Sequence, residues 1–127
     1  MKLRLQSNSI RLRLKRVEVE QLEKTGRVEE KIIMGSGFAD TFHYALQSSN
    51  AVTTPHAILE TKGILVLVPV EAVSRWAAGD YVAMEAILPV GDRGQLQVLV
   101  EKDFACLTGT EEQNADTFPN PLAGTKC

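Results

Sequence analysis

The sequence predicts an α+β fold made from an internally duplicated strand–strand–helix–strand–strand unit. Two observations support this: apolar residues recur at an offset of 54 positions, and polar and apolar residues alternate along short segments such as 2–6 and 10–15. The recurrence is clearest where Ile10, Leu12 and Leu14 match Ile64, Val66 and Val68. We expect about eight mostly antiparallel strands and two short helices, with a closed or partly closed barrel as an option that removes edge strands.

The first unit spans residues 2–48 and is expected to fold as hairpin, helix and hairpin. Ser7-Asn8-Ser9 supplies turn chemistry for the first hairpin, and Gly26 follows the helical pattern as a stop signal. The predicted elements are strands at 2–6 and 10–15, a helix at 17–25, and strands at 27–34 and 38–47.

The second unit, residues 56–103, repeats this plan after a polar linker at 49–55. Residues 64–68 are apolar at every position, which is typical of a strand covered on both faces. The offset of 54 matches Val28 with Val82 and Leu22 with Trp76, and we expect Leu22 and Trp76 to pack in the core. The predicted elements are strands at 56–60 and 64–68, a helix at 69–78, and strands at 81–88 and 95–102.

The chain of 127 residues predicts a single domain, with residues 104–127 as a C-terminal tail. This tail is expected either to dock through Phe118 and Leu122 or to be largely disordered. No run of 18 apolar residues and no signal peptide are present, so we expect a cytoplasmic protein without a membrane segment. In that reducing compartment the two cysteines, Cys106 and Cys127, are expected to be free thiols.

Basic residues alternate with leucines along the first two predicted strands. Arg4, Arg11 and Arg13 would share one face of a hairpin, where guanidinium groups could bind an anionic, phosphate-bearing small molecule. The alternative is a solvated face whose charge is balanced by Glu29, Glu30 or Glu101. Nucleic acid is an unfavourable partner, because no aromatic side chains interleave with these charges and the pI is about 5.7.

A second candidate site lies at the end of the last predicted strand. Glu101, Asp103 and Cys106 offer two carboxylates and a thiolate, which are ligands for a divalent metal. The alternative is that Cys106 is a small buried side chain in the core. The sequence identifies no other cofactor and no catalytic constellation.

The duplicated eight-strand layout resembles the architecture of the CYTH, or triphosphate-tunnel, enzymes. Those enzymes carry a Glu-x-Glu-x-Lys signature on the first strand, whereas this chain has Lys2-Leu3-Arg4-Leu5-Gln6 with the opposite charge. The resemblance therefore implies a charged barrel for a phosphate-bearing ligand but brings no catalytic residues.

Two segments together resemble a family of short, uncharacterised bacterial proteins. They are Met1-Lys2-Leu3-Arg4 through Asn8-Ser9-Ile10-Arg11-Leu12-Arg13-Leu14, and Glu101-Lys102-Asp103-Phe104-Ala105-Cys106-Leu107 followed by Asp116-Thr117-Phe118-Pro119-Asn120-Pro121. The resemblance implies a bacterial source and a tail that belongs to the domain, without an assigned activity.

These observations favour a non-enzymatic binding or assembly module that acts on a protein partner or as a homo-oligomer. The alternative hypothesis is binding or hydrolysis of an anionic phosphate-bearing small molecule inside a charged β-barrel, with a divalent metal as a potential cofactor.

Overall fold

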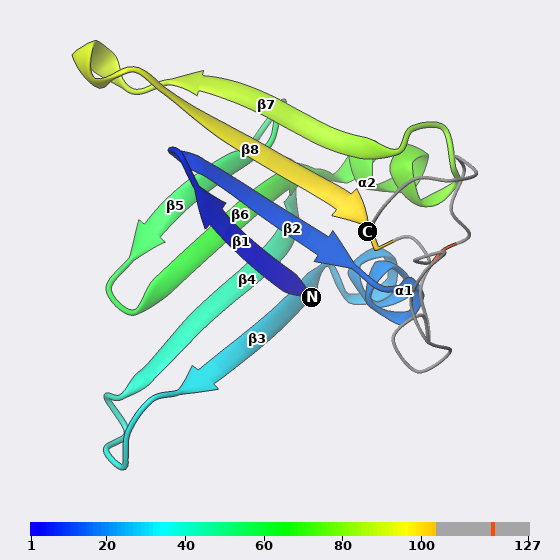
Figure 1. The fold of residues 1–127 in the computed structure, drawn as a ribbon. Helices are drawn as coiled ribbons and strands as arrows, with labels where there is room; N and C mark the ends of the chain where they lie inside the picture. Colours follow the sequence, from blue (N-terminus) through cyan, green and yellow to red (C-terminus); the bar gives the residue numbers. More distant parts are fainter. Residues whose placement is uncertain (104–117, 119–127) are drawn as a thin grey trace, which may run out of the picture.

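A computed structural model describes residues 1–103 and Phe118 (Figure 1). Each half of the chain contributes two strands, a helix and two more strands, as the sequence predicts. The elements of the first half are β1 (Lys2–Gln6), β2 (Ser9–Leu14), α1 (Arg16–Thr25), β3 (Arg27–Ile33) and β4 (Thr41–Ser49). Those of the second half are β5 (His56–Glu60), β6 (Gly63–Pro69), α2 (Val70–Ala77), β7 (Ala83–Pro89), the short 3₁₀ helix η1 (Gly91–Arg93) and β8 (Gln95–Lys102).

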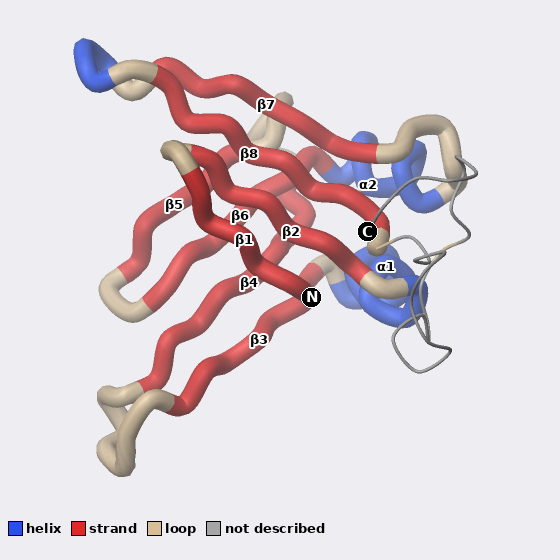
Figure 2. The backbone as a smooth tube through the Cα atoms, viewed as in Figure 1, coloured by secondary structure: helices blue, strands red, loops and turns tan. Residues whose placement is uncertain are grey.

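The eight strands form two four-stranded sheets, and each sheet takes one hairpin from each half. Sheet A has the order β1-β2-β8-β7 and sheet B the order β3-β4-β6-β5. The central pairs, β2 with β8 and β4 with β6, are parallel, whereas the hairpins are antiparallel. Both helices lie at one end of the molecule, opposite the hairpin turns (Figures 1 and 2). The sheets do not close, so the barrel option was wrong: the exchanged hairpins complete two separate sheets, each with two edges.

Strand pairing follows the predicted offset of 54 everywhere except in the third strand of the unit. Ser9 lies opposite Gln97, and 54 positions later Gly63 lies opposite His43. Val28 lies opposite Leu46, however, whereas Met84 lies opposite Val100, so β7 is displaced by two more residues.

Met84 is therefore the counterpart of Val28, and the predicted match with Val82 was wrong. The cause is the connection after the helix: a single residue, Gly26, separates α1 from β3, but residues 78–82 separate α2 from β7. Val82 lies in this longer loop and is 54% exposed, whereas Met84 is buried.

The core lies between the inner faces of the sheets and the two helices. Trp76 and Leu22 are fully buried, as predicted, and the Trp76 indole N–H donates to the Val82 carbonyl at 3.0 Å. The other core residues come from both sheets and both helices: Leu12, Leu14, Val19, Val28, Leu46, Val66, Val68, Val73, Met84, Val98 and Val100.

The helices begin and end where local chemistry requires it. The Glu18 side chain accepts the backbone N–H of Lys15 at 2.9 Å and so satisfies the donor of the residue that precedes α1. Gly26 ends α1 in the left-handed region at φ 77° and donates its N–H to the Leu22 carbonyl. In α2, Pro69 stands before the first residue, where its missing N–H costs no hydrogen bond.

Two other expectations from the sequence need correction. The all-apolar strand β6 is covered on one face: Val66 and Val68 are buried, but Leu65 and Leu67 on the outer face are half-buried. Strand β4 begins at Thr41, because residues 34–40 form a loop closed by the Met34 N–H on the Asp40 carbonyl at 2.7 Å.

The two sheets are tied together along one side by polar contacts. The Met1 amine forms ion pairs with Glu18 and, at 3.1 Å, with Glu30, and the Tyr44 hydroxyl donates to the Met1 carbonyl at 2.7 Å. Burial raises the pKa of Tyr44. In the second half of the chain, Pro55 and Ala72 stand at the positions equivalent to Met1 and Glu18. Ala86 stands at the position equivalent to Glu30 once the displacement of β7 is included.

Phe118 docks against the core, as one of the two expectations for the tail requires. Its N–H donates to the Asp103 carbonyl at 2.8 Å, and its ring packs against the core cluster. Lys102 Nζ lies 5.3 Å and the Arg16 guanidinium 5.5 Å from the ring centre. Leu122, the other expected contact, lies outside the described residues.

Candidate functional site

The three arginines predicted as an anion site lie on the outer face of sheet A. Arg4 on β1 is opposite Arg11 on β2, and Arg13 follows two residues later on the same face. Their leucine neighbours point into the molecule, where Leu12 and Leu14 are buried. Alternation in a strand thus presents the cations to solvent while it fills the core.

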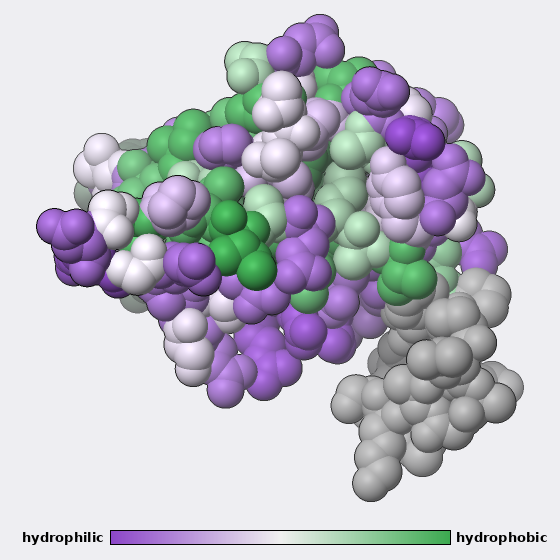
Figure 3. All heavy atoms as spheres, turned by 90° about the horizontal axis from the view of Figure 1, so that it is seen from above, coloured by the Kyte–Doolittle hydropathy of each residue, from purple (hydrophilic) through white to green (hydrophobic). Residues whose placement is uncertain are grey.

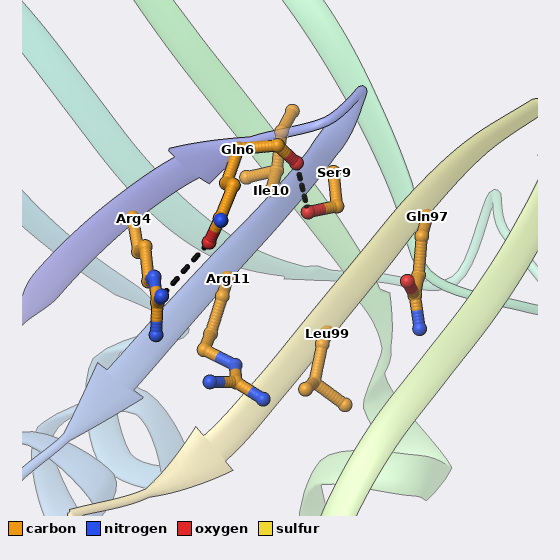
Figure 4. A pocket seen from close by; sticks show the side chains of 7 residues that line it. All are labelled: Arg4, Gln6, Ser9, Ile10, Arg11, Gln97 and Leu99. Atoms are coloured by element: carbon orange, nitrogen blue, oxygen red, sulfur yellow. Dashed lines mark hydrogen bonds between the residues drawn. The ribbon is translucent and has the colours of Figure 1, made fainter.

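A shallow pocket of about 220 Å³ lies on this face, between β1, β2 and β8 (Figure 4). The Arg4 and Arg11 side chains extend toward the same side of the sheet. Arg4 donates to the Gln6 side-chain oxygen at 2.8 Å, and the Ser9 hydroxyl donates to the Gln6 carbonyl. The lining residues are Arg4, Gln6, Ser9, Ile10, Arg11, Gln97 and Leu99.

The turn of the β1–β2 hairpin fixes the position of the pocket. Ser7 and Asn8 both have positive φ, at 48° and 58°, as in the two-residue turns that match strand twist. The Asn8 side-chain N–H donates to the Gln95 carbonyl at 2.6 Å, and the Gln97 N–H donates to the Asn8 carbonyl. These bonds anchor the hairpin turn to β8, which carries the opposite wall.

Glu101 neutralises part of the basic face. One of its oxygens lies 2.5 Å from Arg13 Nε and 3.4 Å from Arg11 Nε. Arg13 is therefore directed away from the pocket and toward this carboxylate. No carboxylate among the residues that the structure describes lies within ion-pair distance of Arg4, which makes Arg4 the least compensated cation of the three.

Of the acids expected to balance the arginines, Glu101 alone does so. Glu29 and Glu30 lie on β3, in the other sheet. Glu29 pairs with Arg27 at 2.9 Å, and this hydrogen-bonded ion pair lowers the pKa of Glu29.

Two of the three residues predicted to bind a metal form ion pairs with basic side chains. Glu101 pairs with the arginines on the outer face, whereas Asp103 is 6% exposed and its Oδ2 lies 3.2 Å from Lys2 Nζ. Apart from this ion pair with Lys2, the buried oxygen has no hydrogen-bond partner within the described part of the chain. Cys106 lies outside the described residues, and the described residues contain no cluster of three metal-ligating side chains. The metal site stays a prediction.

Sequence reasoning identified the two arginines of the pocket but missed the residues opposite them. Gln97 and Leu99 are two residues apart and so share one face of their strand, which the sequence alone shows. Their place beside Arg11 depends on the parallel pairing of β2 with β8, which joins residues about ninety positions apart. No local pattern marks that pairing.

A comparison with protein-family models identifies the family of the chain. The model of a family of unknown function, DUF7009, matches residues 1–122. The chain belongs to this family. The matched range of the DUF7009 protein includes both segments that carry the expected resemblance, and it extends through most of the tail.

No curated protein and no solved structure matches the DUF7009 chain. The comparisons therefore indicate no activity. Within the part of the DUF7009 protein that the structure describes, no helix has the length and apolar character needed to cross a membrane.

Proposed function

We propose that this protein is a binding module for a small anionic ligand, held in the pocket on the outer face of sheet A. The observation that supports this most strongly is that Arg4 and Arg11 line one pocket while Arg4 has no carboxylate partner among the described residues. A guanidinium binds phosphate or carboxylate through parallel, charge-assisted hydrogen bonds, so an anionic group is the natural complement.

The other lining residues narrow the class of ligand. Gln6, Gln97 and Ser9 provide amide and hydroxyl groups for neutral polar atoms, and Leu99 provides apolar contact, whereas the Ile10 side chain packs against the core (Figure 4). The volume of about 220 Å³ lies below the usual range of roughly 300–1,000 Å³ for ligand sites. The fitting class is a phosphorylated or carboxylated metabolite with few carbon atoms.

The proposal is binding rather than turnover. The seven lining residues include no carboxylate, histidine or cysteine that could act as a general base or nucleophile. The hydrolytic alternative also required cations inside a barrel, whereas Arg4, Arg11 and Arg13 lie on the outside of an open sheet. The tunnel-like mechanism is therefore not supported by this geometry.

Titration of ¹⁵N-labelled protein with inorganic phosphate, sulfate and a panel of small phosphorylated and carboxylated metabolites tests this proposal. We expect saturable shifts at Arg4, Ser9 and Gln97 with at least one ligand. Arg4→Gln combined with Arg11→Gln should weaken that binding at least tenfold.

Arg75→Gln on α2 is the matched control and should leave the affinity unchanged, since Arg75 lies on another element and pairs with Asp80. A ligand at 100-fold its dissociation constant should also add about 2.7 kcal/mol to stability. The absence of any saturable shift, or equal binding by wild type and the double variant, would refute the proposal.

A further inference from the structure

The edge strands β1 and β5 occupy equivalent places in the two sheets but differ sharply in their side chains. β1 ends sheet A and β5 ends sheet B, and each pairs with the next strand in the same register. β1 reads Lys-Leu-Arg-Leu-Gln and β5 reads His-Ala-Ile-Leu-Glu. An edge strand offers unpaired backbone groups to another chain unless charge or shape prevents it.

The sequence of β5 is complementary to itself in the antiparallel direction. Pairing two copies about Ile58 places Ile58 opposite Ile58, Ala57 opposite Leu59, and His56 opposite Glu60. The first two pairs are apolar, and a small residue meets a large one. The third joins an imidazole to a carboxylate at each end of the paired segment.

The backbone of β5 has the hydrogen-bonding parity that this register needs. Thr61-Lys62 is a two-residue turn, so the flanking Glu60 and Gly63 form a hydrogen-bonded pair with each other. Backbone N–H and C=O groups point to alternate sides of a strand from one residue to the next. Those of Ala57 and Leu59 therefore point away from β6. In the proposed register these two residues bond to each other across the interface, and Ile58 occupies the close, non-hydrogen-bonded position.

The side chains of β5 are exposed on both faces of the sheet. Leu59 is 88% exposed on the inner face and Ile58 is 44% exposed on the outer face. Hydrophobic residues gather on the side of the molecule seen from above, next to a hydrophilic margin (Figure 3). This is the side on which the β5 and β7 edges lie, away from the polar contacts of Met1.

β1 lacks this capacity for self-pairing. Its residue equivalent to Ile58 is Arg4, so the same antiparallel register would place Arg4 directly opposite Arg4. Like charges in directly opposed positions destabilise a strand pair. Pairing of β5 with β5 uses the same strand on both molecules, and such an isologous contact closes about a twofold axis instead of extending into a fibre.

We propose that two copies of this chain pair through antiparallel β5 strands, so that their B sheets join into one continuous eight-stranded sheet across a twofold axis. The arginine pocket lies on sheet A and is not part of this interface, so the proposed dimer and the proposed anion site can be tested independently.

Sedimentation equilibrium over a wide range of protein concentration tests the dimer. Wild type should show a concentration-dependent mass that approaches twice that of the chain. Ile58→Arg, which introduces the residue found at the equivalent position of β1, should raise the dissociation constant at least tenfold.

Leu59→Pro is a second variant with a different mechanism. It removes an N–H that faces away from β6, a position at which an edge strand tolerates proline, and it should also yield a folded monomer. Ile87→Arg on the β7 edge is the matched control, since Ile87 is 58% exposed on a neighbouring edge, and it should leave the dimer intact. Circular dichroism confirms that each variant is folded.

A wild-type protein that stays monomeric at millimolar concentration would overturn the proposal. So would a folded Ile58→Arg or Leu59→Pro variant that dimerises as tightly as wild type.

Discussion

At the scale of single residues, Lys102 is one of two buried charged residues in the described structure. Its side chain is 9% exposed, and Nζ lies 5.8 Å from the ring centre of Trp76 and 5.3 Å from that of Phe118. No carboxylate among the described residues forms an ion pair with it. The aromatic faces offset part of the cost of burying the charge, but burial still lowers the pKa of Lys102.

Lys102→Met should stabilise the protein near neutral pH. The change removes the buried charge but keeps an unbranched side chain, and stabilising substitutions commonly contribute about 0.5–2 kcal/mol. The folded pKa lies below the unfolded value of 10.5, so the unfolded chain binds more protons between the two values. The free energy of unfolding of wild type therefore increases relative to that of Lys102→Met as pH rises through this window.

Urea unfolding of wild type and Lys102→Met at about pH 7 and about pH 10 measures both effects. Lys24→Met, on the exposed end of α1, is the control and should change stability by less than about 0.5 kcal/mol. A Lys102→Met variant that is less stable than wild type at neutral pH would show that the aromatic contacts outweigh burial.

Trp76→Ala should lower the free energy of unfolding by about 3–5 kcal/mol, because it removes a fully buried ring and the indole hydrogen bond to Val82. Tyr81→Ala, an aromatic truncation at 36% exposure, should cost far less. Denaturant unfolding of both variants provides the comparison. Similar losses for the two would contradict the central place of Trp76 in the core.

The burial of Trp76 and Leu22 could be predicted because both occupy the same position of a short amphipathic helix. The environment of Lys102 could not be predicted, since it depends on contact with Phe118 of the C-terminal tail. The sequence likewise grouped Arg4, Arg11 and Arg13 correctly on one face. It did not show that Glu101 would engage Arg11 and Arg13 while leaving Arg4 uncompensated.

At the scale of elements, the first and last residues of strands next to strong turn signals were predicted correctly, as in β1, β5 and β8. The displacement of β7 by two residues was not, because the longer connection after α2 leaves the alternating pattern on either side unchanged. Parallel pairing of β2 with β8 and of β4 with β6 also leaves no signal in either strand alone. Pairing partners depend on the complete fold rather than on local periodicity.

Gly63→Ala should disrupt the central pairing of sheet B. A Cβ at this position would lie 1.8 Å from the His43 carbonyl oxygen, so β4 and β6 would have to separate. Overpacking of this kind costs about 1–3 kcal/mol or more. Ser9→Ala is the control, since Ser9 holds the equivalent place in sheet A and already carries a Cβ.

Thermal unfolding of the two variants measures the difference. Ser9→Ala loses its hydroxyl bond to the Gln6 carbonyl and should cost about 0.5–1.5 kcal/mol, less than Gly63→Ala. If Gly63→Ala is the milder change, the close approach of the two strands is not as the structure places it.

At the scale of the whole molecule, the exchange of hairpins makes each half dependent on the other. Residues 1–50 supply β1 and β2 to one sheet and β3 and β4 to the other, and the second half does the same. Neither half contains a complete sheet, so an isolated half would expose the apolar surface that the intact chain buries.

Fragments 1–50 and 51–127, produced separately, should therefore be unfolded as monomers and should regain structure when mixed. Circular dichroism and the dispersion of amide NMR signals measure the recovery. A stable, folded monomer formed by either fragment alone would contradict this interdependence.

The parallel pairing of β2 with β8 also has a kinetic consequence. It joins Ser9 to Gln97, so sheet A cannot be completed until nearly all of the described chain has left the ribosome. Sheets that depend on contacts between distant residues fold slowly, on the order of milliseconds to seconds, because chain entropy is lost before those contacts form. During synthesis the leucines of β1 and β2 remain uncovered, and the alternating lysine and arginine residues of these strands then act as gatekeepers against aggregation. The same cations that form the proposed anion site would thus protect the nascent chain before that site exists.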